Sequence, residues 1–230
     1  MRKRQPDVPL QNRKNGENGH LRQKGKIAEL ALGYGGSTGA LISMGAAAMG
    51  IPEDELKPLV DAWRDANPKI VDYWWAVDRA AKTAIRLRIP QHAGSVHFVM
   101  KSGALFVILP SGRQLAYLKP RLEENQFGGE SITYYGSDTQ KHWCRVESYG
   151  PKIVENITQA ICRDLLAEAM QNLTEKSHKI VGHVHDEVII ETEKNTTVEE
   201  ICEEMQKSPP WLPGIELRAD GYECGYYMKL

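Results

Sequence analysis

The chain has 230 residues, of which 41% are hydrophobic and 26% charged, and its formal net charge is -1. These values are ordinary for a soluble globular protein of one or two domains, and the total charge does not indicate a nucleic-acid-binding protein. The four cysteines are widely spaced without a CxxC pair, which argues against a zinc knuckle or a disulfide framework. The polar N-terminus and the lack of a long apolar run predict a soluble, cytoplasmic protein without membrane contact.

Local charge is more informative than total charge at the N-terminus. Residues 1–30 contain eight lysines and arginines but three acidic residues, and such a basic segment attracts phosphate groups over a short range. A solvated basic tail is the alternative for residues 1–14. Residues 1–19 are polar, with two prolines and two Asn-Gly pairs, which predicts a disordered basic tail.

The next segment, residues 20–90, is predicted to be mostly helical. Apolar residues recur there at helical spacing, and Asn67 is an expected N-cap before Pro68 at the first position of a long helix. The glycines of 34–39 lack the spacing of a phosphate-binding loop, so a turn between two helices is the better interpretation. The expected helices cover residues 20–33, 38–49, 52–66 and 68–85.

The following segment, residues 91–150, is predicted to be mostly β. Short runs with strand-like composition are joined there by Lys-Ser-Gly and Pro-Ser-Gly turns. The expected strands cover residues 94–100, 103–109, 113–117 and 131–136.

The last segment, residues 151–230, mixes helices and strands. A capping box formed by Thr196 and Glu199 is expected to start a helix that ends near Lys207. The other expected elements are a helix over 152–173, a strand, tight turn and strand over 179–191, and a final strand over 215–220. The order of elements predicts an α+β fold with a small antiparallel sheet.

Four side chains spaced four residues apart form a slowly winding stripe on the first helix. They are Arg22, Lys26, Leu30 and Tyr34. Two cations and a phenol on one stripe suit a polyanion with an aromatic or sugar end, such as a nucleoside triphosphate. The spacing alone favours a solvated helix face.

The segment VGHVHDEVIIE (181–191) places polar side chains between two apolar runs. A carboxylate at the tip of a hairpin can meet a ligand at modest desolvation cost, and hard oxygen ligands suit Mg²⁺. In a regular strand Asp186 and Glu187 would point to opposite faces, unless the turn re-aims one of them. His183 and His185 could instead join a zinc or hydrolase site. A polar hairpin tip without a ligand is the remaining alternative.

Gln159 lies on the helix expected over 152–173, close to its apolar face. Its amide could contact the minor-groove acceptors that every base pair presents. Taken alone, a partly exposed glutamine is the more common interpretation.

Two segments, in this order, resemble motifs of the family A DNA polymerases, the DNA polymerase I type. LRQKGKIAELALGYGG (21–36) is similar to motif B, Arg-x3-Lys-x3-Phe-x3-Tyr-Gly, which lies on the fingers helix. VGHVHDEVIIE (181–191) is similar to motif C, the His-Asp-Glu hairpin of the palm. The amino-acid sequences of residues 109–121 and 152–170 are similar to those of phage and prophage members of the family. This similarity implies that the protein acts in the cytoplasm of a bacterial or phage-infected cell.

This resemblance covers roughly residues 20 to 230 and implies a partial polymerase fold. It implies fingers helices over 20–90, a mostly β insertion over 91–150, and a part of the palm over 151–230. The implied reaction is the attack of a primer 3′-hydroxyl on the α-phosphate of a dNTP, opposite a DNA template.

The resemblance also implies roles for the stripe on the first helix. Arg22 and Lys26 would contact the β and γ phosphates of the incoming dNTP, and Tyr34 would pack beside the nascent base pair. Leu30 stands where bacterial members have Phe or Tyr, so sugar discrimination at this position is left open.

The remaining implied roles belong to the primer and the metal ions. Gln159 would touch the minor groove near the primer terminus, and His185 would brace the primer end. Asp186 would ligate the catalytic Mg²⁺ ions of a two-metal site, and Glu187 would support that site. His183 has no implied role.

Motif A, Asp-(Tyr/Phe)-Ser-x-x-Glu, carries the second metal-binding aspartate of the family, and it occurs nowhere in the 230 residues. The sequence therefore predicts a C-terminal fingers–palm fragment that binds primer–template DNA and dNTPs but needs a separate chain to supply motif A and the thumb. One alternative is a relic that binds nucleotide or DNA without turnover. The other is a metal-dependent hydrolase that uses His183, His185 and Asp186.

Overall fold

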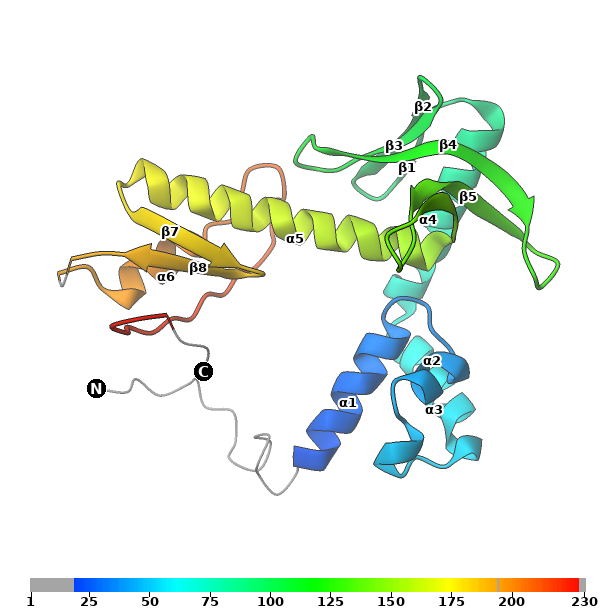
Figure 1. Cartoon of the computed structure of the whole chain (residues 1–230), viewed down its shortest axis with the longest axis horizontal. Coiled ribbons are helices and arrows are strands. Elements are labelled where there is room, and N and C mark those ends of the chain that lie inside the picture. Colours follow the sequence, from blue (N-terminus) through cyan, green and yellow to red (C-terminus); the bar gives the residue numbers. More distant parts are fainter. Residues whose placement is uncertain (1–18, 194, 228–230) are drawn as a thin grey trace. The chain divides into compact units, whose positions relative to one another are not determined.

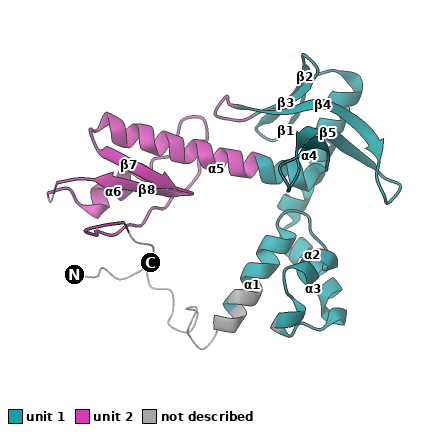
Figure 2. Ribbon diagram, in the orientation of Figure 1, with its two compact units in different colours: residues 1–108, 114–156 teal, residues 109–113, 157–230 magenta. Residues whose placement is uncertain are grey.

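A computed structural model of the chain describes residues 19–193 and 195–227 (Figure 1). Residues 1–18 of the predicted basic tail lie outside the described residues, and Gly19 begins the first helix. The chain divides into two compact units (Figure 2). Unit 1 comprises the described residues within 1–108 and 114–156, and unit 2 comprises those within 109–113 and 157–230.

Unit 1 begins with the predicted helical segment. Its helices are α1 (Gly19–Leu32), α2 (Thr38–Ser43), the short 3₁₀ helix η2 (Ala47–Met49), α3 (Glu53–Ala66) and α4 (Pro68–Leu87). The expected helices before Gly33, after Pro52 and from Pro68 are therefore confirmed. The single helix expected over 38–49 is wrong, because Gly45 has φ +91, which a right-handed helix cannot continue through.

The helices of unit 1 share an apolar core around two tryptophans. The rings of Trp63 and Trp74 stack with their centroids 5.8 Å apart, and Trp74 is buried. Trp63 also joins α3 to α1, since its Nε1 donates to Glu29 Oε1 at 3.1 Å. Asn67 occupies the predicted N-cap position of α4, but its side chain donates to the carbonyl of Trp63 at 2.8 Å instead of capping α4.

A six-stranded antiparallel sheet follows, with its strands in chain order. The strands are β1 (Gln91–Ala93), β2 (Val96–Lys101), β3 (Ala104–Ile108), β4 (Gln114–Glu124), β5 (Glu130–Ser137) and β6 (Trp143–Ser148). Four of them match expected strands, and β1 and β6 were not predicted. Helices together with antiparallel sheets confirm the α+β fold.

A buried carboxylate positions the start of α5 (Gly150–Glu175) against α4. Asp78 Oδ1 accepts a hydrogen bond from the Gly150 amide at 3.0 Å, and Lys82 Nζ lies 2.6 Å from Asp78 Oδ2. Asp78 therefore satisfies an amide that the helix itself leaves unpaired. Gly150 is required here, because a Cβ atom would lie 2.3 Å from the carbonyl oxygen of Trp74.

Unit 2 holds most of α5 and three further elements: β7 (Lys179–Val184), β8 (Glu187–Glu191) and α6 (Val198–Met205). The predicted strand, turn and strand are confirmed as the antiparallel pair β7–β8. The helix start is one residue later than expected, because Thr197 rather than Thr196 is the N-cap and accepts from the Glu200 amide at 3.2 Å.

The final strand expected over 215–220 is wrong, because this segment is not a strand in the structure. Its residues do alternate between half-buried and exposed positions. Such alternation shows that one side of an extended chain packs against the protein. A strand also needs backbone hydrogen bonds to a neighbouring strand.

Candidate functional site

The predicted stripe on α1 is open to solvent. Arg22 and Lys26 are exposed, Leu30 is 49% exposed, and Tyr34 is half-buried just beyond the end of the helix. Among the described residues, neither Arg22 nor Lys26 forms an ion pair or a hydrogen bond. The two cations are therefore available to an anionic ligand along one side of the helix.

The opposite side of α1 attaches the helix to unit 1. Ala31 and Leu32 are buried, and Glu29 accepts the hydrogen bond from Trp63. This arrangement leaves the stripe facing outward without weakening the packing of α1.

Two glycines hold the turn that follows Tyr34. Gly35 has φ +82, and a Cβ atom there would lie 2.5 Å from the ring of Pro151. A Cβ atom on Gly36 would lie 2.0 Å from the carbonyl oxygen of Ala31. The expected turn between two helices is thus confirmed, and its glycines allow the chain to pass close to neighbouring backbone.

The second set of candidate residues lies on the β7–β8 hairpin. Val184 pairs with Glu187, so His185 and Asp186 form a two-residue turn. His185 has φ +53, while Asp186 is not among the described residues with a positive φ. A positive φ at the first position alone is the pattern of a type II′ turn, which prefers glycine there. A histidine at this position costs about 1–2 kcal/mol of backbone strain.

The turn places Asp186 outside both strands. His183, Asp186 and Glu187 are all exposed, and Glu187 is the first residue of β8. The pairing places His183 beside Val188 and Glu187 beside Val184, which are opposite faces of the hairpin. Asp186 therefore lies exposed at the tip of the hairpin.

A bulge and an ion pair fix the register of the hairpin. Ile180 pairs with Ile190 and Gly182 with Ile189, so Val181 is the extra residue of a β-bulge. At the open end, Lys179 Nζ lies 2.5 Å from Glu191 Oε2, and this hydrogen bond lowers the pKa of Glu191.

A C-terminal tyrosine lies near the hairpin, and sequence reasoning missed it. Burial raises the pKa of Tyr222, and the charges of Cys224 and Glu187 raise it further. A separation of 35 residues along the chain between Glu187 and Tyr222 gives no signal of this proximity. The aromatic segment YECGYY was the one available hint.

Gln159 lies on α5, where it is exposed between the buried residues Ile157 and Ala160. The candidate residues thus form two sets. Arg22, Lys26, Leu30 and Tyr34 belong to unit 1, whereas Gln159, His185, Asp186 and Glu187 belong to unit 2.

The hairpin tip offers only part of a metal site. Among residues 19–193 and 195–227, no three His, Cys, Asp or Glu side chains lie close enough to hold a metal ion. Carboxylate oxygens are nevertheless the donors that Mg²⁺ prefers, and Mg²⁺ is commonly held by one or two carboxylates together with substrate phosphates. Asp186 and Glu187 therefore fit a metal ion that is shared with a nucleotide.

Comparison with known proteins finds a similar phage protein. The chain is 48% identical over 214 residues to a "DNA polymerase" of Bacillus phage SP02, an alignment that covers 91% of this chain. The chain spans about a third of the length of that relative, since the alignment covers 33% of it. No family model and no solved structure matches the chain. None of the described helices combines the length and apolar character that a membrane crossing needs.

Proposed function

We propose that this chain is the fingers–palm part of a family A DNA polymerase and takes part in template-directed transfer of a nucleotide from a dNTP to a primer. The observation that carries the proposal is the 48% identity with a phage DNA polymerase over 91% of the chain. The two motif-like segments support it, because each lies on the element that the resemblance requires, a helix and a hairpin.

In this proposal α1 holds the triphosphate. Arg22 and Lys26 are exposed and lie four residues apart, so both can approach one polyanion. Contacts between such cations and phosphate oxygens are charge-assisted and stronger than neutral hydrogen bonds. Tyr34 would pack beside the nascent base pair, and Leu30 would lie between the phosphate contacts and this ring.

The hairpin would serve the primer end. Asp186 would ligate Mg²⁺, Glu187 would support that carboxylate, and His185 would brace the primer terminus. Gln159 would contact the minor groove of the primer–template duplex. The position of His185 supports this assignment, because it is exposed in the hairpin turn next to Asp186.

The proposed reaction is an in-line displacement. A lone pair of the primer 3′-oxygen forms a bond to the α-phosphorus as the bond from that phosphorus to the β-bridging oxygen breaks. The hydroxyl proton is lost to solvent, and pyrophosphate leaves with the electron pair. When bound, Mg²⁺ would stabilise the attacking and leaving oxygens. The residues of α1 would hold the triphosphate in line with the primer.

The 230 residues contain no motif A, so we propose that catalysis by these residues needs added polypeptide that carries motif A and the thumb. Primer extension with Mg²⁺ is expected to be negligible for this chain alone and to begin when such a polypeptide is added. Asp186→Asn should reduce extension in the mixture by at least about a hundredfold, because it removes a carboxylate that the metal ions need.

The matched control is Glu203→Gln, which neutralises an exposed carboxylate on α6 of the same unit and should leave extension unchanged. A mixture that binds primer–template but never extends it would contradict the catalytic proposal. That outcome would favour the relic that binds DNA without turnover.

A further inference from the structure

The six-stranded sheet of unit 1 has one face that is covered by α4 and a second face with exposed side chains. Strands β1, β2, β3 and β4 contact α4, and Val96, Phe98 and Leu105 are fully buried. In β5, Ile132 is likewise fully buried. Alternate residues of a strand point to opposite faces, so Thr133, Tyr135 and Ser137 share the other face.

The pairing of β5 with β4 and β6 extends this second, exposed face of the sheet across three strands. Tyr135 pairs with Leu118 of β4 and with Arg145 of β6, while Ser137 pairs with Trp143. We call the resulting surface the outer-face patch. It consists of Leu118, Arg121, Tyr135, Trp143 and Arg145, which the register places on this face, and of Lys119, which lies in the irregularity of β4 and contacts the ring of Tyr135.

Apolar and aromatic groups of the outer-face patch are open to solvent. Trp143 is 65% exposed, Leu118 41% and Tyr135 37%. A sheet face that carries such groups side by side is suited to binding, since single scattered apolar residues are the usual pattern on a surface.

Two cations flank the ring of Tyr135. Arg145 Cζ lies 4.7 Å from the centre of the ring, and Lys119 Nζ lies 5.7 Å from it. Arg145 also donates to Thr133 Oγ1 at 2.8 Å and to the carbonyl of Lys119 at 3.3 Å. These contacts hold the guanidinium in place, so the cationic and aromatic groups are positioned before any ligand arrives.

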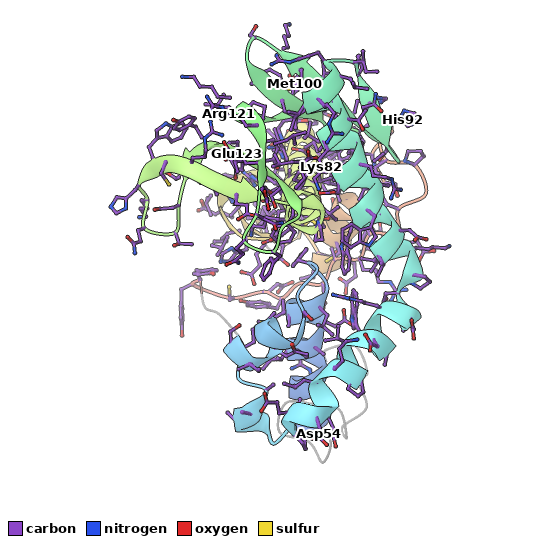
Figure 3. All side chains as sticks on the ribbon, turned by 90° about the vertical axis from the view of Figure 1, so that its right-hand side faces the viewer. Asp54, Lys82, His92, Met100, Arg121 and Glu123 are labelled. Carbon is purple, nitrogen blue, oxygen red and sulfur yellow. The ribbon has the colours of Figure 1, made fainter. Side chains whose placement is uncertain are left out.

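The charges of the outer-face patch favour an anionic partner. Three cations of the patch, Lys119, Arg121 and Arg145, lie near two carboxylates, Glu123 and Glu147. Glu123 accepts a hydrogen bond from Thr133 at 2.9 Å, which occupies one of its acceptor positions. Figure 3 shows Arg121 and Glu123 projecting from β4, with α4 on the other side of the view.

We propose that the outer-face patch binds single-stranded nucleic acid. Unpaired bases would stack on Trp143 and on the Arg145–Tyr135 pair, and backbone phosphates would contact Lys119 and Arg121. A duplex hides its bases, and an acidic protein has none, so neither uses the aromatic and cationic groups together. This proposal does not depend on the polymerase assignment, because the residues of α1 and of the β7–β8 hairpin take no part in it.

Titration of the full chain with a labelled oligothymidylate of about ten nucleotides tests the proposal. Trp143→Leu should weaken binding roughly 5- to 100-fold, because stacking of one base is lost, whereas Trp143→Phe should retain most of the affinity. Trp75→Leu is the matched control, since Trp75 is 52% exposed on α4 and should not affect binding. Unchanged thermal midpoints would show that these variants remain folded.

The salt dependence of binding tests the phosphate contacts. Arg121→Gln should reduce the slope of log affinity against log salt by about 0.7, the value for one contact to a single strand. Arg79→Gln, a change at an exposed cation on α4, should leave the slope unchanged. Equal binding by the wild type and Trp143→Leu would overturn the proposal. Tighter binding of polyglutamate than of the oligonucleotide would overturn it too, because it would identify an acidic protein as the partner.

Discussion

At the scale of single residues, a substitution of His185 should change stability and activity in opposite directions. Its φ of +53 is a conformation that glycine adopts without strain. His185→Gly is therefore expected to stabilise unit 2 by about 0.5–1 kcal/mol, since relief of strain exceeds the extra freedom that glycine gains in the unfolded chain. Urea denaturation measures the change in the free energy of unfolding.

The same substitution should lower primer extension in the complemented mixture, because in the proposed function the imidazole braces the primer end. Ser177→Gly is the matched control: Ser177 has φ +65 in the same unit and no proposed role. It should gain similar stability at unchanged activity. If His185→Gly gains stability and keeps full activity, His185 has no part in the reaction.

At the scale of elements, helical periodicity predicted most of the helices. The ends of α1, α3 and α5 fall within a few residues of their expected positions, because a long apolar face narrows the choice of where each helix begins and ends. The three-residue strand β1 is too short to produce an alternating pattern. In β6 every interior residue is half-buried or exposed, so its sequence lacks an apolar alternation.

The candidate site, too, could be predicted only in part from the sequence. A helix and a hairpin could be predicted from the pattern of residues 20–33 and 179–191, and with them the exposure of Lys26 and Asp186. The proximity of Tyr222 to Glu187 could not be predicted, because it depends on tertiary packing. The positive φ of His185 could not be predicted either, because the turn lacks the glycine that usually marks such a position.

Contact between β4 and the first turns of α5 gives a prediction about pH. Tyr117 is buried, its ring meets that of Tyr134 edge-on at 4.8 Å, and its hydroxyl accepts a hydrogen bond from Asn156 at 3.0 Å. Burial raises the pKa of Tyr117 to about 12 from the ordinary tyrosine value of 10.0. The unfolded chain therefore loses this proton at lower pH than the folded chain, so the stabilising contribution is complete below pH 10 and is lost as the pH rises towards 12.

Tyr117→Phe should remove this part of the pH dependence. Between pH 10 and 12, the free energy of unfolding of the wild type should fall more steeply than that of the variant, by up to about 1.4 kcal/mol per pH unit. Urea denaturation at a series of alkaline pH values measures both slopes. Parallel slopes would show that Tyr117 is not protected from ionisation in the folded state.

At the scale of the whole molecule, the chain concentrates its candidate residues on exposed parts of two units. The net charge of -1 does not reveal these local groups of charged residues, because the exposed cations on α1 are balanced by acidic residues elsewhere. Local exposure and the pattern of residues, rather than total charge, therefore indicate which ligands the molecule suits.

Division into two units predicts that nucleotide binding and turnover depend on different residues. Lys26→Ala should weaken binding of a dNTP to the full chain by roughly tenfold or more, because a charge-assisted contact to phosphate contributes about 1.5–3 kcal/mol. Asp186→Asn, measured without Mg²⁺, should change the affinity by no more than about twofold, since Asp186 is an exposed residue of the other unit. Fluorescence titration with a labelled dNTP measures both affinities.

Arg79→Ala, which removes an exposed cation from α4 of unit 1, is the control for the loss of one positive charge. It should bind dNTP as the wild type does. An affinity of Lys26→Ala equal to that of the wild type would remove α1 from the nucleotide site. An equal loss in Lys26→Ala and Asp186→Asn would instead show that the hairpin carboxylate contributes to nucleotide binding without a metal ion, which the proposed separation of binding from turnover does not allow.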